Sequence, residues 1–146
     1  MGILSAINQA YLDMQRKSFD KIYVMVDLHG TIIKPNYEVG NIPTEFYDHS
    51  KEALKIMSKA KDICLIMYTC SHPHEIKKYV ELFEQNDIHF DYINENPEVV
   101  TQPDGYGCYD KKPYMNLLFD DKAGFLANIE WEGVLKELKM KYGITS

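Results

Sequence analysis

Arginine is almost absent from this chain of 146 residues, and long hydrophobic runs are lacking altogether. Arg16 is the single arginine beside fifteen lysines, so a bidentate guanidinium clamp on a phosphate or carboxylate is not available. An anion site must therefore use lysine, backbone N–H groups or a metal. No apolar run approaches the roughly 20 residues that a membrane-spanning helix needs, so we expect no membrane partner.

Cysteine is also scarce, and the three thiols cannot all pair with one another. Cys64, Cys70 and Cys108 are too few for a disulfide framework in a chain of this length. The amino terminus has no positively charged segment ahead of its apolar residues, and Asp13 comes early, which argues against a secretory signal. These features predict reduced thiols and a cytoplasmic location.

The charge balance is acidic, with 16 basic against 22 acidic side chains, a net charge of −6 and an isoelectric point near 5.3. Broad binding to a nucleic-acid backbone needs a basic face, so this balance argues against it but leaves a small phosphorylated substrate open. Hydrophobic residues make up 45% and charged residues 26%, as in ordinary globular domains. Without repeats or linkers, residues 1–146 are expected to form one domain.

Short apolar runs alternate with segments of helical periodicity, which predicts an α/β fold with a parallel sheet and helices on both sides. An amphipathic helix within residues 1–18 is expected to pack on the body, 21–128 to form the core, and 129–142 to form a final helix. The remaining expectations are strands over 22–26, 63–69, 88–93 and 115–121, helices over 43–60 and 73–86, and an extended flap over 31–42.

Polar side chains follow the apolar runs at the points where the predicted strands end. Asp27, Thr69, Asn94 and the pair Asp120 and Asp121 occupy these positions. In parallel sheets, ligands bind beyond the carboxyl ends of the strands, so these residues are the candidates for chemistry. Three carboxylates that converge there would repel one another unless a hard cation held them, and Mg²⁺ takes such oxygen ligands.

Four short motifs occur in a fixed order along residues 21–128. The sequence DLHGT begins at Asp27, LIMYTCS contains Thr69, KKPY contains Lys112 with Lys111 as the alternative, and FDD ends in Asp120 and Asp121. This order resembles the haloacid dehalogenase-like (HAD) superfamily of phosphatases, and in particular a subgroup of small capless proteins of bacteria and phages. The resemblance implies a three-layer α/β/α sandwich around a Rossmann-like parallel sheet, with no large cap domain.

The resemblance also implies a reaction, a Mg²⁺-dependent hydrolysis of phosphate monoesters. Asp27 would attack phosphorus and form an aspartyl-phosphate, which water then hydrolyses. Mg²⁺ would be held by Asp27, by the backbone carbonyl of His29 and by an acid of the pair Asp120 and Asp121.

The phosphoryl group, in the same resemblance, would be bound by residues of the second and third motifs. These are Thr69, Cys70 and Lys112, and Thr69 and Lys112 would also stabilise the developing charge. The substrate would be a phosphorylated small molecule or an exposed phosphate of a macromolecule. An open, capless site is also compatible with a homo-oligomer in which a neighbour's surface completes it.

One residue departs from the family's pattern. Phosphatases of the family carry a second Asp two residues after the first, where it protonates the leaving oxygen and activates water, and here that position is His29. An imidazole titrates near neutral pH and is able in principle to do the same work. Two alternatives remain: a catalytically silent binding protein with the same fold, and a phosphotransferase that passes the phosphoryl group to another acceptor.

Overall fold

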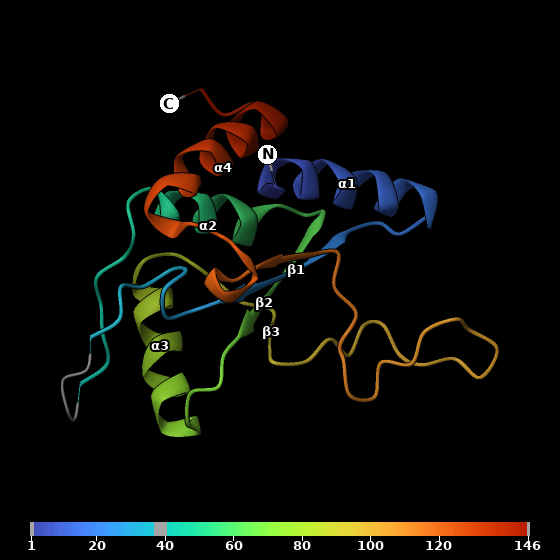
Figure 1. The fold of residues 1–146 in the computed structure, drawn as a ribbon, viewed down its shortest axis with the longest axis horizontal. Coiled ribbons are helices and arrows are strands. Elements are labelled where there is room, and N and C mark those ends of the chain that lie inside the picture. The colour runs from blue at the N-terminus through green and yellow to red at the C-terminus, as the bar shows by residue number, and fades with distance from the viewer. Residues whose placement is uncertain (1, 37–40, 146) are drawn as a thin grey trace.

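The computed structural model describes residues 2–36 and 41–145 and has a four-stranded parallel sheet at its centre (Figure 1). Residues 37–40, in the middle of the expected flap, lie outside the described residues. The elements in chain order are α1 (Gly2–Arg16), β1 (Ile22–Asp27), α2 (Ser50–Lys59), β2 (Ile63–Tyr68), α3 (Pro73–Gln85), β3 (Tyr92–Ile93), β4 (Leu117–Phe119), the 3-10 turn η1 (Asp121–Ala123) and α4 (Ala127–Tyr142).

The strands lie in the order β3-β2-β1-β4, so β1 is central and has a neighbour on each side. Asp27, the last residue of β1, is in register with Tyr68, the last residue of β2. On the other side Val26 is in register with Phe119, the last residue of β4. The carboxyl ends of three strands therefore meet at one edge of the sheet.

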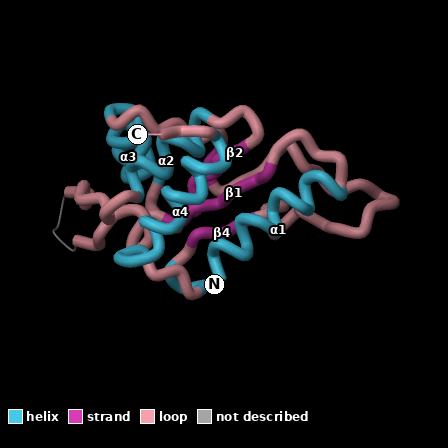
Figure 2. The backbone as a smooth tube through the Cα atoms, turned by 90° about the horizontal axis from the view of Figure 1, so that it is seen from above, coloured by secondary structure: helices cyan, strands magenta, loops and turns pink. Residues whose placement is uncertain are grey.

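The two faces of the sheet are covered differently. Alternate residues such as Val24 and Val26 of β1 face the main core, which includes side chains from all four helices. Tyr23 and Met25 face the other side, where residues between β3 and β4 pack on them, including Val99 and Tyr114. The long connection over 94–116 contains no helix and projects from the body (Figure 1). Figure 2 shows α1, α2 and α4 side by side over one face of the sheet.

Helix α2 begins later than expected, at Ser50 rather than near residue 43. The preceding residues pair instead with the segment after β1, because Lys34 N–H donates to the Glu45 carbonyl at 2.8 Å and Tyr47 N–H donates to that of Ile32 at 2.9 Å. The strand expected over 88–93 is reduced to Tyr92–Ile93, and that expected over 115–121 to Leu117–Phe119.

The expectation of an α/β fold with a parallel sheet is confirmed, and residues 2–36 and 41–145 form no large cap. The layer on the second face consists of irregular chain from the connection 94–116 rather than of a helix. Among the described helices none combines the length and the apolarity needed to span a bilayer.

Candidate functional site

Three carboxylates meet at the carboxyl edge of the sheet. Asp27 ends β1, Asp120 follows β4, and Asp121 opens η1. One carboxylate oxygen from each lies within 4.8 Å of the other two. Asp27 and Asp120 are half-buried and Asp121 is exposed, so the cluster is open to solvent on one side. The structure thus brings together the three acids that the sequence placed at strand ends.

A tight turn after β1 makes room for this cluster. The carbonyl of Leu28 accepts the N–H groups of Thr31, Ile32 and Ile33 at 3.2, 2.9 and 3.0 Å. Gly30 has a φ of +82°, and a Cβ built there would lie 2.5 Å from Asp121 Oδ2. Glycine is therefore required at this position for two reasons, the left-handed backbone and the close approach of the Asp121 carboxylate.

Thr31 joins the two ends of the cluster. Its hydroxyl donates to Asp27 Oδ2 at 3.1 Å and accepts the backbone N–H of Asp121 at 3.0 Å. Thr31 is fully buried, and its carbonyl accepts the indole N–H of Trp131 from α4 at 2.6 Å. One side chain thus fixes the orientation of the Asp27 carboxylate and ties the loop after β4 to the loop after β1.

The electrostatics of the cluster favour a bound cation. Burial and then the nearby Asp120 raise the pKa of Asp27 to about 6, with a smaller contribution from Asp121 and an opposing hydrogen bond from Thr31. Three carboxylates offer only oxygen donors, which suit Mg²⁺ or Ca²⁺ rather than a soft metal. The donor set and the crowding of negative charge therefore fit a hard divalent ion held by Asp27, Asp120 and Asp121.

His29 lies in the same turn but is engaged elsewhere. Its Nε2 is 2.5 Å from the hydroxyl of Tyr79 on α3, and the two rings pack edge to face with centroids 5.4 Å apart. Tyr79 is buried, with 1% of its surface exposed. His29 is therefore held against α3 by a partner that the sequence motifs do not contain.

Thr69 comes directly after β2 and is fixed by hydrogen bonds at that edge. Asn94, which follows β3, accepts the N–H of Thr69 and donates to its carbonyl, both at 2.7 Å. The Thr69 hydroxyl lies 2.8 Å from that of Ser71. Because Tyr68 is the register partner of Asp27, Thr69 follows the strand next to β1 at the same edge of the sheet as the acid cluster. Cys70, the neighbouring candidate, is exposed.

In the part of the chain that the structure describes, neither Lys112 nor the alternative Lys111 forms a hydrogen bond or ion pair with the three acids, although Lys111 lines a surface pocket together with Asn94, which bonds Thr69. Both belong to the connection 94–116, which the side chains of Glu98 and Tyr114 anchor at the amino end of β1. Glu98 bonds Lys21 at 2.7 Å, and the ring of Tyr114 packs edge to face on Tyr23. Figure 1 shows this connection projecting from the side where β1 begins. The assignment of Lys112, or of Lys111, to the phosphate position therefore stays a prediction.

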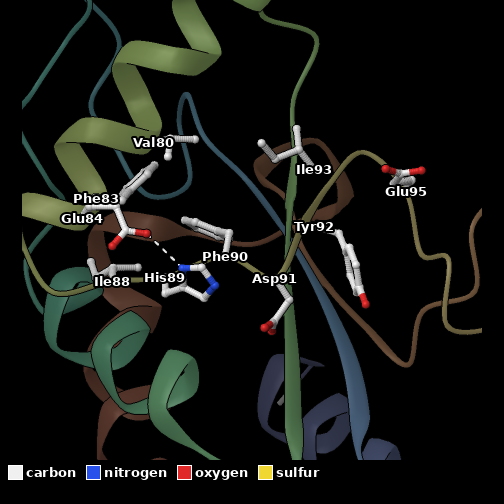
Figure 3. Close-up of a pocket in the computed structure, with 10 residues that line it drawn as sticks. All are labelled: Val80, Phe83, Glu84, Ile88, His89, Phe90, Asp91, Tyr92, Ile93 and Glu95. Carbon is white, nitrogen blue, oxygen red and sulfur yellow. Dashed lines mark hydrogen bonds and ion pairs between the residues drawn. The ribbon is translucent and has the colours of Figure 1, made fainter.

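A groove of about 280 Å³ lies apart from the acids, between α3 and β3 (Figure 3). Phe83, Phe90 and Ile93 contribute to its lining, and Glu84 is paired across it with His89 at 2.9 Å. None of the three clustered carboxylates lines it. The clustered candidate residues therefore lie at an open edge of the sheet and not in this groove.

Two residues at the site were missed by the sequence reasoning. The bridging role of Thr31 had a signal, since it lies four residues after Asp27 at the end of DLHGT. Tyr79 had none, because it falls on the apolar stripe of α3 and the sequence predicts only a core residue there.

Comparisons with known proteins support the fold alone. No protein-family model matches the chain, and no curated protein sequence matches it significantly. A solved structure described as that of a conserved protein from Bacteroides thetaiotaomicron is similar, with a TM-score of 0.62 and 20% identity over 83% of this chain and 92% of that chain. At this identity the similarity concerns the arrangement of the sheet and helices.

Proposed function

We propose that the chain is a HAD-like phosphoric monoester hydrolase that depends on Mg²⁺ and works through a phosphorylated Asp27. The observation that carries this proposal is the meeting of Asp27, Asp120 and Asp121 within 4.8 Å, with the Asp27 carboxylate oriented by a buried threonine. The order of the four sequence motifs supports the same family. When bound, Mg²⁺ supplies positive charge that offsets the charge on the phosphoryl oxygens.

The chain's own residues have separate tasks in this proposal. Asp27 Oδ attacks phosphorus in line with the departing oxygen and is later released by water. Thr31 keeps the attacking carboxylate in one orientation, which lowers the entropic cost of reaching the transition state. Thr69 and Ser71, at the end of the neighbouring strand, offer hydroxyl groups to the phosphoryl oxygens. Asp120 and Asp121 hold the cation.

The test is release of inorganic phosphate from acetyl phosphate and para-nitrophenyl phosphate with Mg²⁺ and with EDTA. We expect turnover by the wild type with Mg²⁺, loss of turnover in EDTA, and loss in Asp27→Asn. Asp104→Asn is a matched control, since Asp104 is an exposed acid in the connection 94–116. Equal rates for the wild type and Asp27→Asn would refute the assignment of the nucleophile.

A binding protein without turnover is the second candidate, and the bond between His29 and Tyr79 favours it, because this bond occupies the residue at the acid/base position. It predicts Mg²⁺ binding, measured by calorimetry, that Asp27→Asn weakens while no phosphate is released from either substrate.

A further inference from the structure

The side chain of His29 is committed to α3. Its Nε2 contacts the Tyr79 hydroxyl at 2.5 Å, and the edge-to-face packing of the two rings, with an interplanar angle of 77°, fixes the plane of the imidazole. Tyr79 is buried, and burial raises the pKa of its phenol to about 12, so the hydroxyl keeps its proton at neutral pH. At neutral pH, the partner of the His29 imidazole on α3 is therefore the uncharged hydroxyl of Tyr79.

The groups that contact the clustered carboxylates are poor proton donors. The Thr31 hydroxyl already donates to Asp27, and Asp120 accepts the backbone N–H of Lys122 at 3.0 Å. His72 and His74 stack on each other at the start of α3, with ring centroids 5.7 Å apart. Within residues 2–36 and 41–145, no imidazole, lysine or phenol forms a hydrogen bond or ion pair with the three carboxylates.

The need for a proton depends on the leaving group. A general acid contributes about 10²–10⁴-fold when the departing oxygen is strongly basic. An alkoxide resembles hydroxide, whose conjugate acid has a pKa of about 15.7, and so requires that proton. A carboxylate, whose conjugate acid has a pKa of about 4, departs as an anion without one.

We propose that this site acts on phosphoryl groups carried by leaving groups of low pKa, acyl phosphates above all, and discriminates against alkyl phosphates. The inference rests on the proposed function of Asp27. It adds the substrate class, which follows from the contact between His29 and Tyr79 and from the lack, among the described residues, of an imidazole, lysine or phenol bonded to the three carboxylates.

The reaction balances without a general acid in its first step. An oxygen of Asp27 forms a bond to phosphorus, the bond between phosphorus and the acyl oxygen breaks, and its electron pair leaves with the carboxylate. Water then forms a bond to phosphorus, the electron pair of the second broken bond returns to Asp27, and the proton lost by water goes to solvent. The net change is acyl phosphate plus water to carboxylate, inorganic phosphate and a proton.

The experiment measures kcat/KM with Mg²⁺ for acetyl, para-nitrophenyl, phenyl and ethyl phosphate in three proteins. These are the wild type, His29→Asp and the matched control His29→Asn, which loses the same contact with Tyr79 but gains no acid. We expect wild-type kcat/KM to fall steeply along this series. His29→Asp should raise kcat/KM for phenyl phosphate by about 10²-fold over His29→Asn, with little difference between the two variants on acetyl phosphate.

The outcomes separate this inference from the proposed function. If the wild type cleaves phenyl and ethyl phosphate as fast as acetyl phosphate, another donor such as His72 supplies the proton, and the substrate class is wrong while the phosphatase assignment stands. Equal kcat/KM for His29→Asp and His29→Asn on phenyl phosphate also overturns it. No turnover of any substrate by all three proteins refutes the proposed function itself.

Discussion

Replacing Gly30 with alanine is the sharpest test of the site's geometry. The left-handed backbone at φ +82° costs a residue with a Cβ about 1–2 kcal/mol. Part of this is offset, by about 0.4–1 kcal/mol, because alanine restricts the unfolded chain more than glycine does. The added Cβ would also lie 2.5 Å from Asp121 Oδ2, so the carboxylate must move away from Asp27 and Asp120. We therefore expect Gly30→Ala to lose about 1 kcal/mol of stability and at least about tenfold in Mg²⁺ affinity.

Gly143→Ala is the control that separates the cost of the left-handed backbone from the displacement of the Asp121 carboxylate. Gly143 also has a left-handed backbone, with φ +67°, but a Cβ there meets nothing within 4 Å. Urea unfolding should show similar losses for both variants, whereas calorimetric titration with Mg²⁺ should show weaker binding only for Gly30→Ala. Wild-type Mg²⁺ affinity in Gly30→Ala would refute the reasoning, because it would mean that the Asp121 carboxylate can leave its place without cost to the cation site.

Three further predictions concern the same edge of the sheet. Without metal, the pKa of Asp27 is raised to about 6, so the folded state binds a proton on this carboxyl more tightly than the unfolded chain does. The stabilisation from this proton is present at low pH and is lost as the pH rises through about 6. In EDTA, Asp27→Asn should therefore raise the urea midpoint at neutral pH, and the gain should vanish below about pH 4, the ordinary pKa. Thr31→Val should cost about 1–3 kcal/mol in urea unfolding and weaken Mg²⁺ binding, whereas Thr31→Ser should retain both; equal behaviour of the two variants would contradict the bridging role. Lys112→Met should lower kcat/KM for phosphate release if the lysine binds the phosphoryl group, and an unchanged kcat/KM would exclude the lysine from the site.

Hydrophobic patterning was sufficient to predict most of the fold. The runs Ile22–Asp27 and Ile63–Tyr68 are apolar on both faces because both strands are central and covered on each side. The errors fall where tertiary contacts decide. The segment before Ser50 has a helical beginning in sequence, but its backbone pairs with Ile32 and Lys34, which no local pattern reveals.

The acids of the site were predictable for a geometric reason. A side chain that follows a parallel strand must lie at the carboxyl edge of the sheet, so the positions of Asp27, Asp120 and Asp121 required only the strand ends. Thr69 was placed by the same argument. Residues that reach the site from other elements, such as Tyr79, cannot be located in this way, because helix packing sets their direction.

The place of Lys112 could not be derived from the strand ends, for a related reason. Its expected place was inherited from the order of motifs along the chain, yet it lies in a connection of more than twenty residues without helix or strand. What fixes such a segment is side-chain contact, here Glu98 with Lys21 and Tyr114 with Tyr23 at the amino end of β1. Motif order constrains strand-end residues well and loop residues poorly.

The scarcity of arginine and the clustering of three carboxylates lead to the same electrostatic conclusion. A phosphate that approaches Asp27 meets two further carboxylates and, within the described ranges, no lysine or arginine paired with any of them. Like charges at such distances repel strongly in a partly buried site. A divalent cation in the cluster would offset two of the three negative charges and so weaken this repulsion. In the proposed function, phosphate binding would therefore be favoured after cation binding, and the acidic composition would not exclude a phosphorylated substrate.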